Sequence, residues 1–134
     1  MAWRDRKPRL LVVDDEEAIL LAVRDYFSHR GFDVSCARDP VEAGRHLDEG
    51  AYDGVIADLR LSGSDSFEGL QIIERVRARS PVTRTIIVTA YGSLEAEREA
   101  RRHGVDAFLH KPVPLAEIAR VVTSLIEAPL SSES

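Results

Sequence analysis

Four short aliphatic runs in the sequence are each followed at once by a side chain that can take part in chemistry. Asp14 and Asp15 follow LLVV, Asp58 follows GVIA, Thr89 follows TIIV, and Lys111 follows AFLH. Neighbouring carboxylates repel one another unless positive charge lies among them, and a site with few protein ligands and room for water suits Mg²⁺ better than Ca²⁺. A bound cation and an ammonium group would together neutralise the oxygens of a phosphoryl group. The pattern therefore predicts a magnesium site that also holds a phosphoryl group.

Zinc does not fit this sequence. The histidines and the single cysteine show no ligand spacing with one another; they are His29, His46, His103, His110 and Cys36. Glu16 and Glu17, which extend the first acidic cluster, have a simpler explanation, because acids in the first turn of a helix are stabilised by its dipole.

The predicted site residues can meet only if the elements that precede them lie in one sheet. The aliphatic runs, which predict strands, lie at 10–13, 32–37, 54–57, 85–88 and 107–110. Between and after them apolar residues recur three or four positions apart, which predicts helices. This alternation of five strands with five helices is typical of an α/β fold with a doubly wound parallel sheet. Functional groups in such sheets lie beyond the carboxyl ends of the strands, where the predicted site residues would share one edge.

The helical segments carry two further signals. Asp39 followed by Pro40 predicts a helix N-cap with proline at the first helical position, and the apolar spacing places Val41 on the buried face of that helix. The segment 93–104 has only Leu94 and some alanines on its apolar side. Because such a helix buries little apolar surface, we expect it to be held weakly and to shift at low cost.

Composition limits the class of protein. A chain of 134 residues is long enough for one domain without a disulfide or metal staple, and a lone cysteine fits a reducing compartment. The sequence has no apolar run of membrane-spanning length and no signal-peptide pattern, so we expect a cytoplasmic protein without a membrane partner. The net charge of -5 argues against direct nucleic-acid binding. We expect a flexible basic arm at 1–8, the domain at 9–128, and a polar tail or the start of a linker at 129–134.

Four motifs together resemble the receiver domains of two-component response regulators. They are VVDDE at 12–16, IADL at 56–59, VTAYG at 88–92 and FLHKP at 108–112. The resemblance extends over nearly the whole chain and implies a flavodoxin-like (βα)5 fold with strand order 2-1-3-4-5. The string TAYGS is also similar to receivers attached to transcriptional activators.

The resemblance implies a role for each matched residue. Asp58 would accept a phosphoryl group from a phosphohistidine on a sensor histidine kinase or phosphotransfer protein. Lys111 would contact the phosphoryl oxygens, and Thr89 would move to hydrogen-bond them while the switch aromatic Phe108 turns inward. The bond from Lys111 to Pro112 would be cis.

The resemblance also implies a Mg²⁺ site and a tuning pair. Asp15, Asp58 and the backbone carbonyl of Arg60 would ligate the metal, and Asp14 would act mainly through a bound water. Arg60 and Tyr91 occupy positions that tune dephosphorylation in the family. Their guanidinium and phenol groups would crowd the path of the attacking water, which predicts a long-lived phosphoryl group.

On phosphorylation, we expect the fourth helix, the fifth strand and the fifth helix to change as one surface. That surface would act on a downstream protein or a fused output domain, and by analogy it would also support a homodimer. The chain would promote only its own phosphorylation and dephosphorylation.

Other functions remain as alternatives. Each site residue taken alone has an ordinary structural explanation, such as a helix N-terminus for Asp14 and Asp15. A phosphohydrolase of the haloacid dehalogenase type needs a second acid where Arg60 stands, and a nucleotide switch needs a phosphate loop that the sequence lacks. The main alternative is a binding module that keeps the receiver fold without phosphorylation. The segment LRLSGSDSFEG also departs from the family pattern, with Ser62 in place of a proline and a few extra residues.

Overall fold

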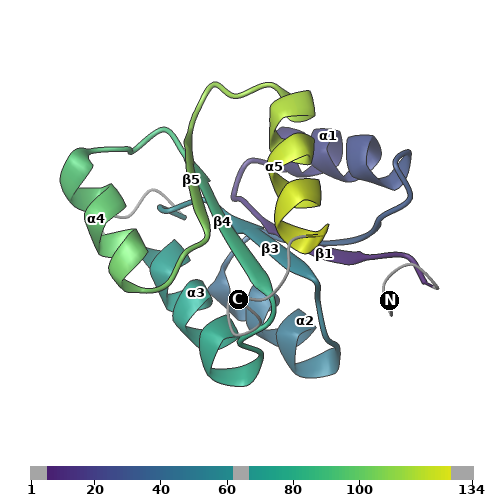
Figure 1. Ribbon diagram of the computed structural model, residues 1–134, viewed down its shortest axis with the longest axis horizontal. Helices are drawn as coiled ribbons and strands as arrows, with labels where there is room; N and C mark the ends of the chain where they lie inside the picture. Colours follow the sequence, from purple (N-terminus) through teal and green to yellow (C-terminus); the bar gives the residue numbers. More distant parts are fainter. Residues whose placement is uncertain (1–5, 62–66, 128–134) are drawn as a thin grey trace.

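The structure is a five-stranded parallel sheet with helices on both faces. It is a computed structural model in which residues 6–61 and 67–127 are described. The strands are β1 (Arg9–Val13), β2 (Asp33–Ala37), β3 (Gly54–Ala57), β4 (Arg84–Thr89) and β5 (Ala107–His110). The helices are α1 (Glu17–Ser28), α2 (Pro40–Glu49), α3 (Glu68–Arg79), α4 (Leu94–Arg102) and α5 (Leu115–Glu127). The strand order β2-β1-β3-β4-β5 confirms the predicted flavodoxin-like topology (Figure 1).

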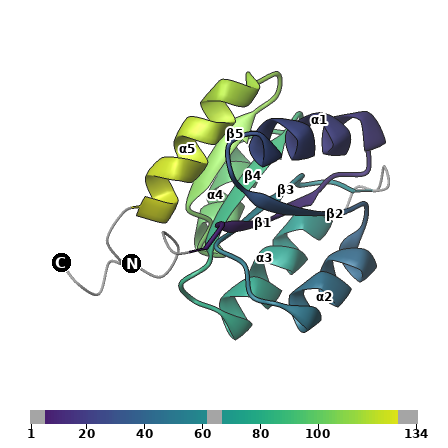
Figure 2. The same cartoon turned by 90° about the vertical axis from the view of Figure 1, so that its right-hand side faces the viewer.

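Alternation of side chains along the strands divides the core into two layers. Leu10 and Val12 of β1 pack with α1 and α5, whereas Leu11 and Val13 pack with helices on the other face. Figure 2 shows α1 and α5 together on one side of the sheet and α2 with α3 on the other. The central strands are buried on both faces, which explains why they appear in the sequence as unbroken aliphatic runs.

The predicted N-cap is confirmed, but two predicted core residues are wrong. The Asp39 carboxylate accepts a hydrogen bond from the backbone N–H of Glu42 at 2.8 Å. Val41 is 67% exposed and Leu94 is 65% exposed, because each lies in the first turn of its helix on the side away from the sheet. On α4 only Ala96 and Ala100 are buried, so that helix contributes even less apolar surface than the sequence suggested.

The segment before β1 contacts the domain. Arg6 forms a bidentate hydrogen bond with Asp53, at 2.9 and 3.1 Å, and the Pro8 carbonyl accepts from the Asp33 N–H. Residues 1–5 and 128–134 lie outside the described residues, so the predicted domain limits stay a prediction.

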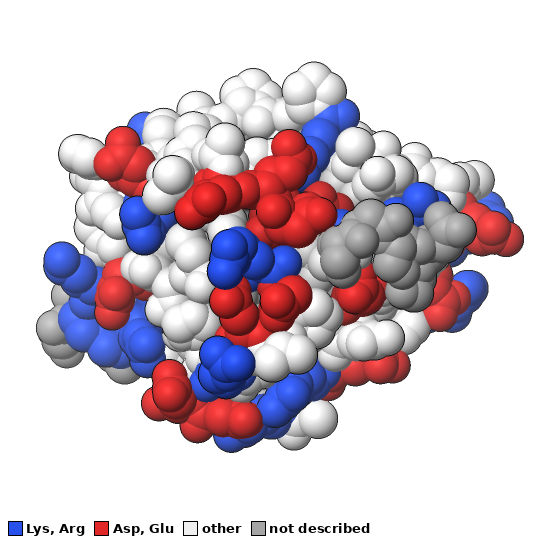
Figure 3. Space-filling model, turned by 180° about the vertical axis from the view of Figure 1, so that it is seen from behind, with Lys and Arg blue, Asp and Glu red and all other residues white. Residues whose placement is uncertain are grey.

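The described helices and the molecular surface give two further results. None of the helices in residues 6–61 and 67–127 is long and apolar enough to cross a membrane. Acidic and basic side chains are mixed over much of the face seen in Figure 3, with a group of basic side chains at its left-hand edge.

Candidate functional site

Asp58, Asp14 and Lys111 meet at the carboxyl edge of the sheet. Asp58 follows β3 and Asp14 follows the neighbouring β1, while Lys111 follows β5 at the far end of the sheet. The Lys111 ammonium donates to one oxygen of Asp14 and one oxygen of Asp58, both at 2.9 Å. Both carboxylate side chains are nearly buried, at 6% exposure for Asp14 and 7% for Asp58. The Lys111 ammonium therefore compensates the charges of Asp14 and Asp58, which would otherwise repel each other.

Thr89 completes the ring of contacts around Asp58. Its hydroxyl donates to Asp58 Oδ1 at 2.8 Å and accepts from the Tyr91 backbone N–H at 3.1 Å. The Arg60 backbone N–H also donates to Asp58 Oδ1, at 3.2 Å. The Asp58 carboxylate thus faces a lysine, a hydroxyl and a backbone donor, which are the groups that can neutralise and orient phosphoryl oxygens.

The electrostatics of this cluster follow from burial and from the shared lysine. Burial is the largest influence on Asp14 and raises the pKa of its carboxyl, although Lys111 and a backbone N–H act in the opposite direction. Burial lowers the pKa of Lys111, but hydrogen bonds and charge from Asp14 and Asp58 together outweigh it, so its pKa is raised. Lys111 therefore stays charged, but its single positive charge faces the two carboxylates of Asp14 and Asp58.

The donor chemistry of the site fits a hard divalent cation. Asp14, Asp58 and the exposed Asp15 are carboxylates at one edge, and Glu16 lies 3.9 Å from the Lys111 ammonium. Among the described residues no group of three potential ligands is arranged as a ready-made metal cage. Mg²⁺ does not require one, since it usually binds through one or two carboxylates together with water and phosphate oxygens.

Arg60 and Tyr91 lie together beside the site. The Arg60 guanidinium carbon is 4.3 Å from the centroid of the Tyr91 ring and 5.7 Å from that of Phe67. Tyr91 is nevertheless 47% exposed, so this cation–π pair lies at the mouth of the site rather than in the core. The sequence analysis identified Arg60 and Tyr91 singly, but not their stacking or the part played by Phe67.

The end of β5 links the site to α4. Phe108 is buried, and its ring meets His110 edge-on with the centroids 5.2 Å apart. His110 in turn lies 3.7 Å from the Glu97 carboxylate on α4. The peptide bond between Lys111 and Pro112 is cis.

Gly69 is a further residue at the site that sequence reasoning missed. A Cβ added to it would overlap the backbone oxygen of Asp58. The first turn of α3 approaches the loop after β3 closely, and the Gly69 N–H donates to the Leu59 carbonyl at 3.0 Å. The pair Glu68-Gly69, ten residues after Asp58, was the signal available in the sequence. The unusual segment at 62–66, including Ser62, lies outside the described residues.

Comparison with known families agrees with this geometry. Residues 10–123 match the family described as the response regulator receiver domain. The chain belongs to this family. The receiver contains the buried Asp58 together with Lys111 and Thr89 at the carboxyl edge of its sheet.

The receiver is similar to part of several longer regulators. It is 34% identical over 109 residues to the alginate biosynthesis transcriptional regulatory protein AlgB of Pseudomonas putida, with 81% of this chain and 24% of that protein covered. It is 32% identical over 126 residues to the transcriptional regulatory protein GlrR of Escherichia coli, with 92% and 28% covered. The chain thus spans about a quarter of the length of these relatives.

Solved structures show the same fold. A CheY-like receiver domain protein from Methanospirillum hungatei has a TM-score of 0.84 at 26% identity, with 90% of this chain and 94% of that chain covered. A response regulator from Burkholderia pseudomallei, with a phosphorylated aspartic acid, a calcium ion and citrate, has a TM-score of 0.80 at 25% identity, with 90% and 70% covered.

Proposed function

We propose that the receiver is a phosphoacceptor switch whose acceptor is Asp58. The observation that carries this proposal is the hydrogen-bonded cluster in which Lys111 and Thr89 both donate to the nearly buried Asp58 carboxylate. The phosphoryl donor would be a phosphohistidine on a sensor histidine kinase or a phosphotransfer protein. The chain acts as a regulator in the cytoplasm and promotes only its own phosphorylation and dephosphorylation.

The transfer follows from the groups around Asp58. One carboxylate oxygen of Asp58 attacks phosphorus as the phosphorus–nitrogen bond to the donor imidazole breaks, and the imidazole leaves with the electron pair and takes up a proton. Lys111 neutralises one phosphoryl oxygen, and the Thr89 hydroxyl can turn from the carboxylate to another. Asp14, Asp15, Asp58 and the Arg60 carbonyl would hold Mg²⁺. When bound, this ion offsets the negative charge that gathers on the transferring oxygens.

Movement of Thr89 gives the site a route to the α4-β5-α5 surface. The Phe108 ring is already buried, so the departure of Thr89 from Asp58 would change the packing around this ring. Phe108 contacts His110, and His110 faces Glu97 on α4. Because α4 buries only two alanines, a small change in these contacts is enough to shift it. The altered surface would control a downstream protein or a fused output domain, or support a homodimer.

The Arg60–Tyr91 pair would prolong the phosphorylated state. The two stacked side chains stand at the mouth of the site and would obstruct water approaching phosphorus in line. We expect Arg60→Ala and Tyr91→Ala each to speed the decay of phosphorylated protein at constant Mg²⁺. A decay rate unchanged in both variants would contradict this role, and the exposed Arg45→Ala on α2 serves as the matched control.

Intact mass tests the acceptor directly. The protein is incubated with Mg²⁺ and acetyl phosphate, and wild type is compared with Asp58→Asn and with the exposed control Asp25→Asn. The proposal expects one added phosphoryl group in wild type and in the control, dependent on Mg²⁺, and none in Asp58→Asn. An equal addition in Asp58→Asn, or none in wild type even with a range of kinases, would instead favour a phosphorylation-independent binding module.

The output surface has its own test. Hydrogen exchange over residues 91–104 should change when the receiver is phosphorylated, whereas exchange in α2 should change little. Unaltered exchange over 91–104 in fully phosphorylated protein would remove α4 from the mechanism.

A further inference from the structure

A large groove lies along α5, away from the phosphoacceptor cluster. It has a volume of about 1310 Å³, and residues of α5 from Ala116 to Glu127 form one wall. The opposite wall comes from Arg6–Pro8 before β1 and from Arg30–Phe32 after α1. Asp14, Asp58 and Lys111 are not among the residues that line the groove. The groove is therefore a separate feature with its own chemistry.

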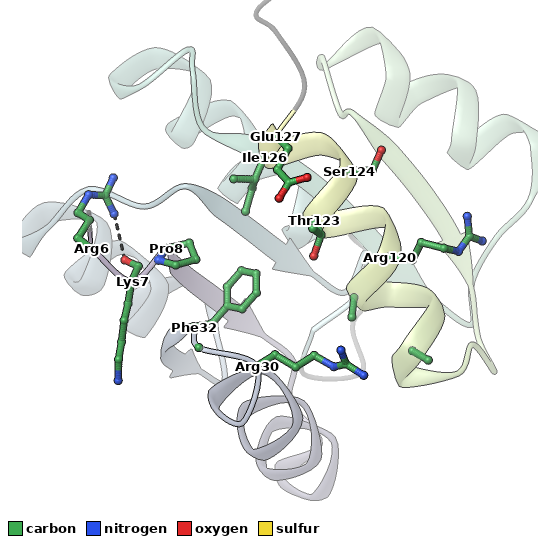
Figure 4. Close-up of a pocket in the computed structure, with 13 residues that line it drawn as sticks. Arg6, Lys7, Pro8, Arg30, Phe32, Arg120, Thr123, Ser124, Ile126 and Glu127 are labelled. Carbon is green, nitrogen blue, oxygen red and sulfur yellow. Dashed lines mark hydrogen bonds between the residues drawn. The ribbon is translucent and has the colours of Figure 1, made fainter. Parts of the chain in front are cut away.

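The floor of the groove is apolar and its rim is basic. Pro8, Phe32 and Ala119 are buried at its base. Four of the lining residues are cations and one is an acid; the cations are Arg6, Lys7, Arg30 and Arg120, and the acid is Glu127. Figure 4 shows Arg30 and Phe32 extending from the α1–β2 connection toward α5, with Thr123 facing them.

The cations of the rim differ in how far their charge is already compensated. Arg6 is held by the Asp53 carboxylate, and Arg120 pairs with Glu117 on its own helix. Arg30 instead donates to the neutral Tyr26 hydroxyl at 2.6 Å and stacks on that ring, so its charge has no carboxylate within salt-bridge distance among the described residues. Lys7 is exposed, and it forms no ion pair with any residue in 6–61 or 67–127. Arg30 and Lys7 therefore remain available to an external anion.

We propose that this groove binds an acidic peptide segment of a partner protein. The α5 wall rises about 1.5 Å per residue and is about 16 Å long, which an extended segment of about five residues would span. Carboxylates of that segment would face Arg30 and Lys7, and alternate apolar side chains would lie along Ala116 and Ile126 of α5. The Thr123 and Ser124 hydroxyls on the α5 wall would bond the peptide backbone.

A peptide fits better than the other anionic partners. Single-stranded nucleic acid needs exposed aromatic rings for stacking, and the one aromatic side chain in this lining, Phe32, is only 8% exposed. An anionic membrane needs a broad basic face, whereas these cations surround a concave groove on a protein of net charge -5.

Titration of the full chain tests this proposal. The probe is a labelled peptide of about six residues in which glutamate alternates with leucine, and the control probe replaces glutamate with lysine. Binding is followed by fluorescence anisotropy and by amide chemical shifts of ¹⁵N-labelled protein. We expect shifts at residues of the groove, affinity that falls with added salt, and binding weakened at least about fivefold by Arg30→Glu and by Lys7→Glu.

Matched variants and competitors make the outcome decisive. Arg45→Glu, an exposed reversal on α2, should leave the affinity unchanged. Absence of binding, equal binding of the lysine probe, or insensitivity to both groove variants would overturn the proposal. Equal competition by a short single-stranded DNA would reassign the groove to polyanions in general. Tighter probe binding after truncation at Glu127 would instead assign the groove to the chain's own C-terminal segment. Phosphorylation of Arg30→Glu by acetyl phosphate should proceed normally, which separates this test from that of Asp58.

Discussion

Replacing Lys111 with methionine should destabilise the fold mainly by leaving two buried carboxylates without their cation. The lysine side chain is 18% exposed, and those of Asp14 and Asp58 are 6% and 7% exposed. At 2.9 Å each contact is worth about 6 kcal/mol of Coulomb energy at an effective dielectric constant of about 20, before desolvation is subtracted.

The net effect is smaller because burying the charges is itself costly. Removing one partner of a buried ion pair costs about 3–5 kcal/mol, and the site lies at an open edge of the sheet where water can enter. We therefore expect Lys111→Met to lower the free energy of unfolding by about 3 kcal/mol at neutral pH. For a domain of this size that corresponds to a fall in Tm of roughly 10 °C.

Chemical and thermal unfolding without Mg²⁺ measure this effect, with Lys7→Met as the matched control on an exposed lysine. Two further results are expected. Adding Mg²⁺ should return part of the lost stability, since the carboxylates again face a cation. Asp14→Asn should change the free energy of unfolding more favourably in the Lys111→Met background than in wild type, because it then removes an uncompensated charge. A loss below about 0.5 kcal/mol, together with no coupling to Asp14, would refute the idea that Lys111 compensates this cluster.

Three other predictions concern the site and its supporting helices. Gly69→Ala should cost about 2 kcal/mol or more in urea unfolding, because the new methyl group overlaps the backbone of Asp58, and it should also slow phosphorylation. Asp39→Ala should cost about 1 kcal/mol through loss of the α2 N-cap and leave phosphorylation unchanged. The raised pKa of Asp14 means that the folded state binds a proton more readily than the unfolded state. Without Mg²⁺, the free energy of unfolding of wild type should therefore fall relative to that of Asp14→Asn as pH rises from about 4 through the folded pKa of Asp14. A wild-type value that instead rises relative to Asp14→Asn over this range would contradict the prediction.

Much of the fold was predictable because the central strands are buried on both faces. Such strands require continuous aliphatic side chains, so LLVV and GVIA stand out from the helical segments, and the acid after each run marks the carboxyl edge. Prediction failed for Val41 and Leu94. Val41 and Leu94 each stand two positions before the first buried residue of their helix, which places them on the opposite side from the sheet. An apolar residue in the first turn therefore does not by itself indicate which face of the helix is buried.

The sequence by itself determined the order of strands and helices, the family of the chain, and which residues stand at the ends of strands. These properties depend on local periodicity and on motifs made of residues that are adjacent in the sequence. Only the tertiary structure decided that Lys111 contacts Asp14 and Asp58 together, that Arg60 stacks on Tyr91, and that Arg30 and Lys7 border a groove along α5. Those contacts join residues from distant elements, and their distances depend on how the helices pack on the sheet, which no local pattern encodes.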